Sequence, residues 1–214
     1  MNDMSKYDKN LKTKGAGCLG AGMIIAMILV FLGIFGVMAY SYYNGMVTRE
    51  ERVTAQWSQV ENLYQRRADL IQNLVNTVKG YSDFEQQTLT QVIEARSKAT
   101  SLTVDASKLT EENVSAFQEA QDGLKSAYSR MLLVVENYPD LKANQNYMAL
   151  MSQLEQTENM LAAERNTFNE YARQYNTDIR KFPRNIFASM FGFDQKAYFK
   201  ADEGAQKVPE VKFD

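Results

Sequence analysis

The chain has 214 residues with no histidine, one cysteine and a formal net charge of −2. Because histidine is the commonest general base near neutral pH and the commonest metal ligand, its absence excludes histidine-dependent triads, HExxH zinc sites and mixed His/Cys metal clusters. The charge balance also lacks the basic excess of a nucleic-acid-binding protein. Carboxylate, lysine and serine chemistry stay open, but the chain has no recognisable nucleophile motif. We therefore expect no enzymatic activity, no cofactor, no metal site and no nucleic-acid partner.

The first element expected along the chain is a transmembrane helix. Residues 15–48 carry no charged side chain, and the core of this run, Leu19 to Tyr40, is 22 residues long. About 20 apolar residues span a bilayer. A cleavable signal peptide is the alternative, processed near Ala39, but its apolar core would span only about 7 to 15 residues. We therefore predict a retained anchor over residues 19–43, preceded by a short basic tail, residues 1–18.

Side chains at the two ends of this span predict its interface and its orientation. Tyr40, Tyr42 and Tyr43 lie where interfacial aromatic residues gather. Four lysines precede the span, whereas Arg49 and Arg52 follow it beside two glutamates. The positive-inside rule then places the short tail in the cytoplasm and the large domain outside the inner membrane, on its periplasmic side, by a margin of two charges.

The next stretch predicts a helix that continues from the span. Apolar residues recur at alternating steps of four and three from Val53 to Val78, the spacing of a helix packed in a bundle, and Arg67 falls on the same stripe. Gly80 is expected to end this helix. Since no proline interrupts Leu19 to Gly80, the membrane helix and the soluble helix are expected to form one rod of roughly 90 Å.

Three further helices are expected after Gly80. The stretch Ser82–Glu85 has the form of a capping box and predicts the start of the second. The polar stretch Thr100–Ser107 is expected to be a loop, and Thr110 is expected to cap the third helix. Pro139 favours a tight reversal and is expected in the first turn of the fourth helix, which ends at Phe182-Pro183.

The fold class predicted is all-α, with the N-terminal transmembrane helix followed by an antiparallel up-and-down bundle of about four long helices over residues 44–183. Four charged residues fall on or beside the buried stripes, and they are Arg67, Arg96, Glu158 and Arg165. One interpretation is an interior ligand-binding or proton-relay site. The interpretation we favour is a buried polar network that fixes helix register with little net gain in stability.

The segment that follows the bundle, residues 184–199, is too apolar to remain exposed to water without a packing partner. We expect it to fold back on the end of the bundle; the alternative is docking on a neighbouring subunit or on the membrane surface. The side chains predicted to form this partner or packing surface are Ile186, Phe187, Met190, Phe191 and Phe193. Residues 200–214 are expected to form a polar tail.

Blocks of residues between Tyr43 and Phe199 occur in a characteristic order and spacing. They are YNGMV (43–47), Glu51, Val53, Trp57, QRRADLIQNLVNTVKGY (65–81), Ala95-Arg96, ENYPDLKA (136–143), LEQTENMLAAERNTFNEYARQYN (154–176), FPRNIFASMFGF (182–193) and Tyr198-Phe199. In these blocks the chain resembles the LemA family. Gln72 departs from the pattern, because the family usually has proline there.

The resemblance implies a bacterial single-pass membrane protein with a mostly helical soluble domain and no established enzymatic activity or cofactor. Related domains in magnetosome membrane proteins suggest membrane organisation or remodelling, and other relatives lie near membrane proteases. The family has also been assigned the opposite topology, with the helical domain in the cytoplasm.

These observations predict a membrane-anchored scaffold without catalytic activity. It would contact the lipid bilayer, self-associate as a homo-oligomer or bind other membrane proteins, and so organise or remodel the envelope. Small-residue pairs in the span, such as Gly22 with Ala26, permit close helix contact in lipid. The alternatives are a ligand-sensing or signalling bundle and an accessory protein of a membrane protease.

Overall fold

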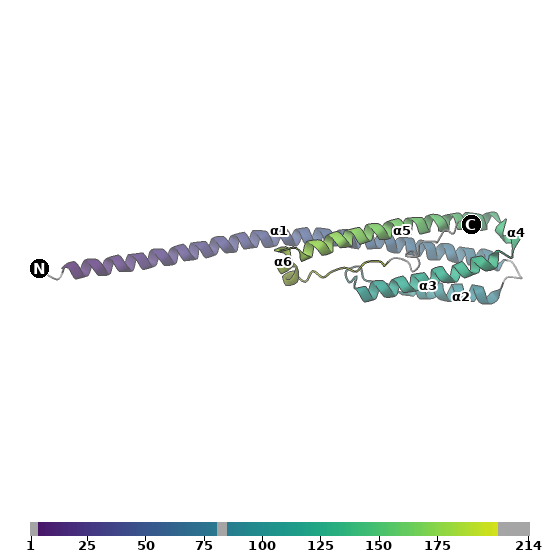
Figure 1. The fold of residues 1–214 in the computed structure, drawn as a ribbon, viewed down its shortest axis with the longest axis horizontal. Helices are drawn as coiled ribbons and strands as arrows, with labels where there is room; N and C mark the ends of the chain where they lie inside the picture. Colours follow the sequence, from purple (N-terminus) through teal and green to yellow (C-terminus); the bar gives the residue numbers. More distant parts are fainter. Residues whose placement is uncertain (1–3, 81–84, 201–214) are drawn as a thin grey trace, which may run out of the picture.

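The structure is a computed structural model that describes the backbone of residues 4–80 and 85–200, with side chains from residue 22 onward. Most of the expected capping box, the side chains of the basic tail and the polar tail after Lys200 lie outside the described residues. Over the described ranges the regular structure is entirely helical. The predicted all-α class, with an N-terminal apolar helix leading into a bundle, is confirmed (Figure 1).

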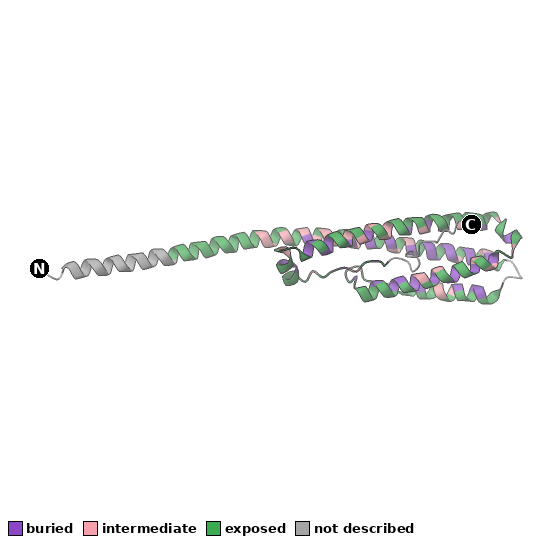
Figure 2. Cartoon of the chain, viewed as in Figure 1, coloured by how far each residue is buried: buried purple, intermediate pink, exposed green. Residues whose placement is uncertain are grey.

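Helix α1, Met4–Lys79, is continuous over 76 residues, which confirms the predicted rod. Its N-terminal half projects beyond the rest of the molecule, and its C-terminal half becomes one wall of the bundle (Figure 1). Within the described part of this helix that begins at Gly22, one 18-residue stretch has a mean hydropathy of 2.7, so the helix is long and apolar enough to cross a membrane. Its large apolar side chains are exposed from Met23 to Val37, as lipid-facing side chains are in a lone helix (Figure 2).

Five shorter helices complete the fold, and they are α2 (Gln86–Ser101), α3 (Glu111–Val135), α4 (Pro139–Lys142), α5 (Gln145–Arg180) and α6 (Arg184–Phe191). Helix α5 runs back along α1, while α2 and α3 form an antiparallel pair whose first member packs on α1. Helix α6 lies beside α1 where the projecting half meets the bundle (Figure 1).

Local capping signals explain where two of these helices begin. The Thr110 hydroxyl accepts a hydrogen bond from the amide of Asn113 at 3.2 Å, so the predicted cap of the third helix is confirmed. The expectation that Pro139 opens the long fourth helix is wrong. Pro139 starts the one-turn helix α4, and the Asn144 side chain then caps α5 by accepting a hydrogen bond from the amide of Asn146 at 2.9 Å. The asparagine cap restarts the helix because it satisfies amides that would otherwise lack partners.

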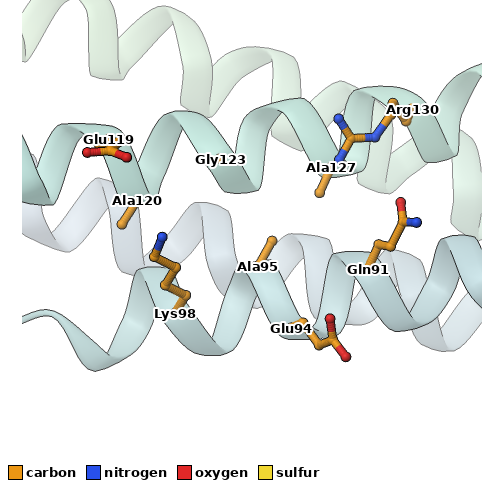
Figure 3. Close-up of a pocket in the computed structure, with 9 residues that line it drawn as sticks. All are labelled: Gln91, Glu94, Ala95, Lys98, Glu119, Ala120, Gly123, Ala127 and Arg130. Carbon is orange, nitrogen blue, oxygen red and sulfur yellow. The ribbon is translucent and has the colours of Figure 1, made fainter.

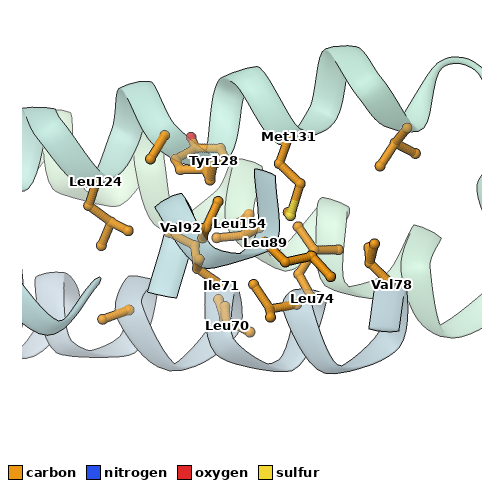
Figure 4. Close-up of a cluster of buried hydrophobic side chains, with 14 of the residues drawn as sticks. Leu70, Ile71, Leu74, Val78, Leu89, Val92, Leu124, Tyr128, Met131 and Leu154 are labelled. Atoms are coloured by element: carbon orange, nitrogen blue, oxygen red, sulfur yellow. The ribbon is translucent and has the colours of Figure 1, made fainter. Parts of the chain in front are cut away.

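Two clusters of buried side chains fill the bundle. The cluster far from the span brings α1, α2, α3 and α5 together around Ile71, Leu74, Leu89 and Met131 (Figure 4). The cluster near the span is aromatic and surrounds Trp57, which is fully buried. Buried and exposed residues alternate along each bundle helix with the helical period (Figure 2), so the apolar stripes read from the sequence are the faces that meet.

Candidate functional site

A buried polar cluster surrounds Arg67, whose side chain is only 3% exposed. Its Nη1 lies 3.2 Å from Oε1 of Glu158 on α5. Its Nη2 donates to the main-chain oxygen of Gln121 on α3 at 3.0 Å and to the side-chain oxygen of the same residue at 2.9 Å. Gln121 in turn donates to the carbonyl of Ala99 on α2 at 3.1 Å. The cluster therefore ties all four long helices together at one height.

The contacts of Glu158 in this cluster favour one register of α5 against α1. The Tyr128 hydroxyl donates to Oε1 of Glu158 at 3.3 Å, so the carboxylate accepts from two neighbours. Burial, followed by the negative charge of Glu158, raises the pKa of Tyr128 to about 12, so the phenol stays protonated at neutral pH. A buried pair adds little net stability when intact but is costly to break, which disfavours any register that separates Arg67 from Glu158.

The other two charges predicted for this network have different partners. Arg96 is half-buried; its Nε donates to the carbonyl of Ala68 at 3.0 Å and its Nη2 lies 3.3 Å from Asp69 Oδ1, both on α1. Arg165 donates from Nη2 to the carbonyl of Lys200 at 2.8 Å. The structure thus joins Arg67 with Glu158 and places Arg96 and Arg165 at the margins of their buried stripes.

The structure contains an extended segment, residues 193–200, that was not among the predicted elements; we call it the strap. The strap runs along the bundle from α6 toward the middle of α5. Three side-chain amides each accept from the N–H and donate to the carbonyl of one strap residue, at distances of 2.8 to 3.1 Å, as a neighbouring strand would. The pairs are Asn176 with Lys196, Asn169 with Phe199, and Gln118 with Lys200.

Side chains of the strap complete the core near the span. The Phe199 ring stacks on Trp57 with centroids 5.5 Å apart and an interplanar angle of 8°, and it meets Phe168 edge-on at 5.3 Å. Lys196 is 5% exposed, and its Nζ lies 2.6 Å from Oε1 of Glu50 on α1. The strap is therefore an integral part of the bundle. A usable sequence signal was the set of amide side chains on otherwise apolar faces of α3 and α5.

The tyrosines predicted for the membrane interface lie where α6 packs on α1. The Tyr42 ring lies 5.4 Å from that of Phe187, and the Tyr43 ring lies 5.2 Å from Phe191 and 5.7 Å from Phe193. Tyr40 is 73% exposed. The aromatic residues of the apolar segment therefore fold back and pack on α1, as predicted.

Two members of the predicted apolar surface do not share that packing. Phe187 is buried, whereas Ile186 and Met190 remain 53% and 55% exposed. Folding back thus leaves a second, outward-facing apolar stripe on α6.

Two surface depressions lie farther from the span. One, which we call the distal groove, separates α3 from α5, has a volume of about 580 Å³ and is lined by Tyr128, Leu132, Tyr147, Met148, Met151, Ser152, Leu154, Glu155, Glu158 and Asn159. The other lies over α2 and α3, where Ala95 points toward α3 while Glu94 points away from it (Figure 3). Within residues 22–80 and 85–200, no group of three histidine, cysteine, aspartate or glutamate side chains is placed to hold a metal ion.

Comparison with known proteins gives a consistent set of relatives. A family model described as the LemA family matches residues 56–213. The chain is 27% identical over 207 residues to magnetosome protein MamQ 1 of Paramagnetospirillum magneticum, covering 87% of this chain and 74% of that protein. It is 26% identical over 198 residues to magnetosome protein MamQ of Magnetospirillum gryphiswaldense, with 83% and 71% covered. It is 24% identical over 179 residues to protein LemA of Metamycoplasma hominis, with 84% and 78% covered.

Proposed function

The chain belongs to the LemA family, and from this premise we propose that it is a membrane-anchored helical scaffold, which binds partner proteins or further copies of itself to organise or remodel the bacterial envelope. Relatives named as magnetosome proteins support a role in membrane organisation. The observation that carries the proposal is the unbroken helix α1, which joins the apolar span to the bundle without a hinge.

A continuous helix fixes the position of every surface of the bundle relative to the apolar half of α1. From Tyr43 to Lys79, α1 extends about 54 Å at 1.5 Å per residue. The distal groove is therefore held some tens of ångströms from the lipid, at a height set by the length of the helix. A fixed height and direction is what a scaffold needs in order to align its partners.

The distal groove supplies the binding surface in this proposal. Its walls are α3 and α5, and its floor includes the buried side chain of Leu154. Met148 is 51% exposed at its rim, and Met151 is half-buried beside it. Methionine adapts its shape to different partners, and an apolar groove between two helices accepts the apolar face of a third. The expected occupant is a helix from a second copy or from another membrane protein.

Site-specific photocrosslinking in native membranes tests this role. A benzoylphenylalanine placed at Met148 is expected to give a discrete crosslinked adduct. The matched control is Met160, on the same helix and 48% exposed but outside the groove, which is expected to give little or none. Full-length protein that remains monomeric at every concentration tested, with no adduct at either position, would rule out the scaffold role.

For the location we propose the bacterial inner membrane with the bundle on the periplasmic side, as the charges flanking the span favour. The cytoplasmic orientation is the alternative. It gains support from the fold, because Arg180, Lys181 and Arg184 lie at the same end of the bundle as Arg49. Labelling of a single cysteine at exposed Ser58, in a Cys18→Ser background, with a membrane-impermeant maleimide on intact spheroplasts distinguishes the two orientations.

A further inference from the structure

Helix α6 packs against α1 at a depth that belongs to the bilayer. The Phe187 ring lies 5.1 Å from the ring of Phe35 and 5.4 Å from that of Tyr42. Phe35 lies five residues before Tyr40, where the apolar run ends, and five residues of helix correspond to about 7.5 Å. When α1 spans a membrane, Phe187 therefore lies level with the edge of the hydrocarbon region.

The surface that α6 turns away from α1 is apolar at this same depth. Ile186 and Met190 are four residues apart on one stripe, and both are more than half exposed. Phe182, just before the helix, is 81% exposed, and Phe191 at its end is 41% exposed. Four large apolar side chains within ten residues would be costly to keep in water, whereas a membrane interface would bury them.

Cationic side chains border the apolar stripe on the side of the bundle. Arg180 and Lys181 are exposed at the end of α5, and Arg184 opens α6. The Arg184 guanidinium forms an ion pair with Asp178 and lies 5.3 Å over the ring of Tyr42. Cations adjacent to a short apolar helix match the negative phosphate layer, which lies directly above the acyl chains.

We propose that Phe182 and helix α6 form a lipid-contacting interfacial segment, with Phe182, Ile186 and Met190 inserted at the boundary between headgroups and acyl chains. The partner is the lipid bilayer itself, on the leaflet from which α1 emerges toward the bundle. The segment gives the bundle a second attachment to the membrane. The proposal rests on the span of α1 and stands apart from the scaffold role.

Depth-dependent fluorescence quenching of the full-length protein tests this proposal. In a Cys18→Ser background, single-cysteine variants Ile186→Cys and Met190→Cys carry the environment-sensitive dye NBD. The matched control is Ser189→Cys, which lies on the exposed polar stripe of the same helix, and Ser58→Cys on α1 serves as the water reference. The proteins are reconstituted in phosphatidylcholine and phosphatidylglycerol vesicles, with nitroxide lipids labelled at shallow or deep acyl positions.

The expected result is a blue-shifted NBD emission at Ile186 and Met190, with most of the signal lost to shallow nitroxides and little lost to aqueous iodide. Ser189 is expected to show weaker lipid quenching, and Ser58 none. The same pattern is expected in nanodiscs that hold one copy of the protein. Unchanged emission from buried Trp57 verifies that each variant is folded.

Two results would overturn the proposal. Equal iodide quenching at Ile186, Met190 and Ser58 would mean that α6 faces water. Protection from iodide without nitroxide quenching, or protection from iodide that disappears at one copy per nanodisc, would mean that another protein surface covers α6.

Discussion

Replacing Glu158 by glutamine tests the buried polar cluster most directly. The substitution keeps the size of the side chain and an oxygen that can still accept from Arg67 and Tyr128. It removes the negative charge that faces the buried guanidinium. Any loss of stability therefore reports the charge itself, with little contribution from packing.

The expected loss follows from burial and geometry. Arg67 is 3% exposed, so an uncompensated charge on it would be poorly hydrated, and its Nη1 lies 3.2 Å from Glu158 Oε1. Breaking a fully buried pair costs about 3 to 5 kcal/mol. The Glu158 side chain is 26% exposed, so water screens part of the charge. Gln121 also continues to accept two hydrogen bonds from Arg67 in the variant. We therefore expect Glu158→Gln to lower the free energy of unfolding by about 2 kcal/mol.

Thermal unfolding followed by the emission of Trp57, the single tryptophan, provides the assay. For a domain of this size, a loss of about 2 kcal/mol corresponds to a drop in Tm of roughly 4 to 8 °C. The control is Glu155→Gln, on an exposed position one turn earlier on α5, which is expected to stay within about 0.5 kcal/mol of the parent. If the two variants melt at the same temperature, Glu158 does not act as the counterion of Arg67.

Three further expectations concern other parts of the bundle. Asn169→Ala should lower the free energy of unfolding in urea by about 2 kcal/mol, because it leaves the N–H and the carbonyl of Phe199 in the strap without their hydrogen-bond partner. Asn166→Ala, at an exposed position on the same helix, should change it little, and equal effects would show that the Asn169 side chain does not hold the strap. Gly192→Ala should lower the free energy of unfolding by about 1 kcal/mol, because Gly192 has a φ of +76°, which an alanine rarely adopts. In the same titration Gly123→Ala, at an exposed helix position with open space around it, should raise the free energy of unfolding by at most about 1 kcal/mol. The pKa of Tyr128 rises from 10.0 to about 12 on folding, so the protonated phenol stabilises the fold fully below pH 10, and this stabilisation is lost as the pH rises toward 12. Tyr128→Phe should therefore make the free energy of unfolding fall less steeply with pH in alkaline urea titrations. An unchanged slope would exclude Tyr128 as the cause of the fall.

The features that the sequence predicted correctly depend on near neighbours in the chain. The apolar steps from Val53 to Val78 specify the buried face of α1 without reference to other elements, and the hydroxyl of Thr110 caps α3 across three residues. The length of the apolar run likewise indicates a helix that is long and apolar enough to span a membrane. Pro139 misled because a second local signal, the Asn144 cap, lies five residues later and restarts the helix.

The features that were missed depend on segments far apart in the sequence. Residues 193–200 show no helical period, and the amides that hold them come from two different helices, so nothing local marks the strap. The sequence placed Arg67 and Glu158 on buried stripes, but their pairing depends on the register of α5 against α1. Arg96 and Arg165 lie at stripe margins, where a small rotation of the helix decides whether a charge faces the interior.

The continuity of α1 has a mechanical consequence. When the apolar half of such a rod spans a bilayer, the rod acts as a lever, and a change in the tilt of that half is reproduced at the far end. A tilt change of about 10° over the 54 Å from Tyr43 to Lys79 would swing the tip sideways by about 9 Å. Because helices tilt to match the thickness of their bilayer, the lateral position of the tip would become a readout of local membrane thickness.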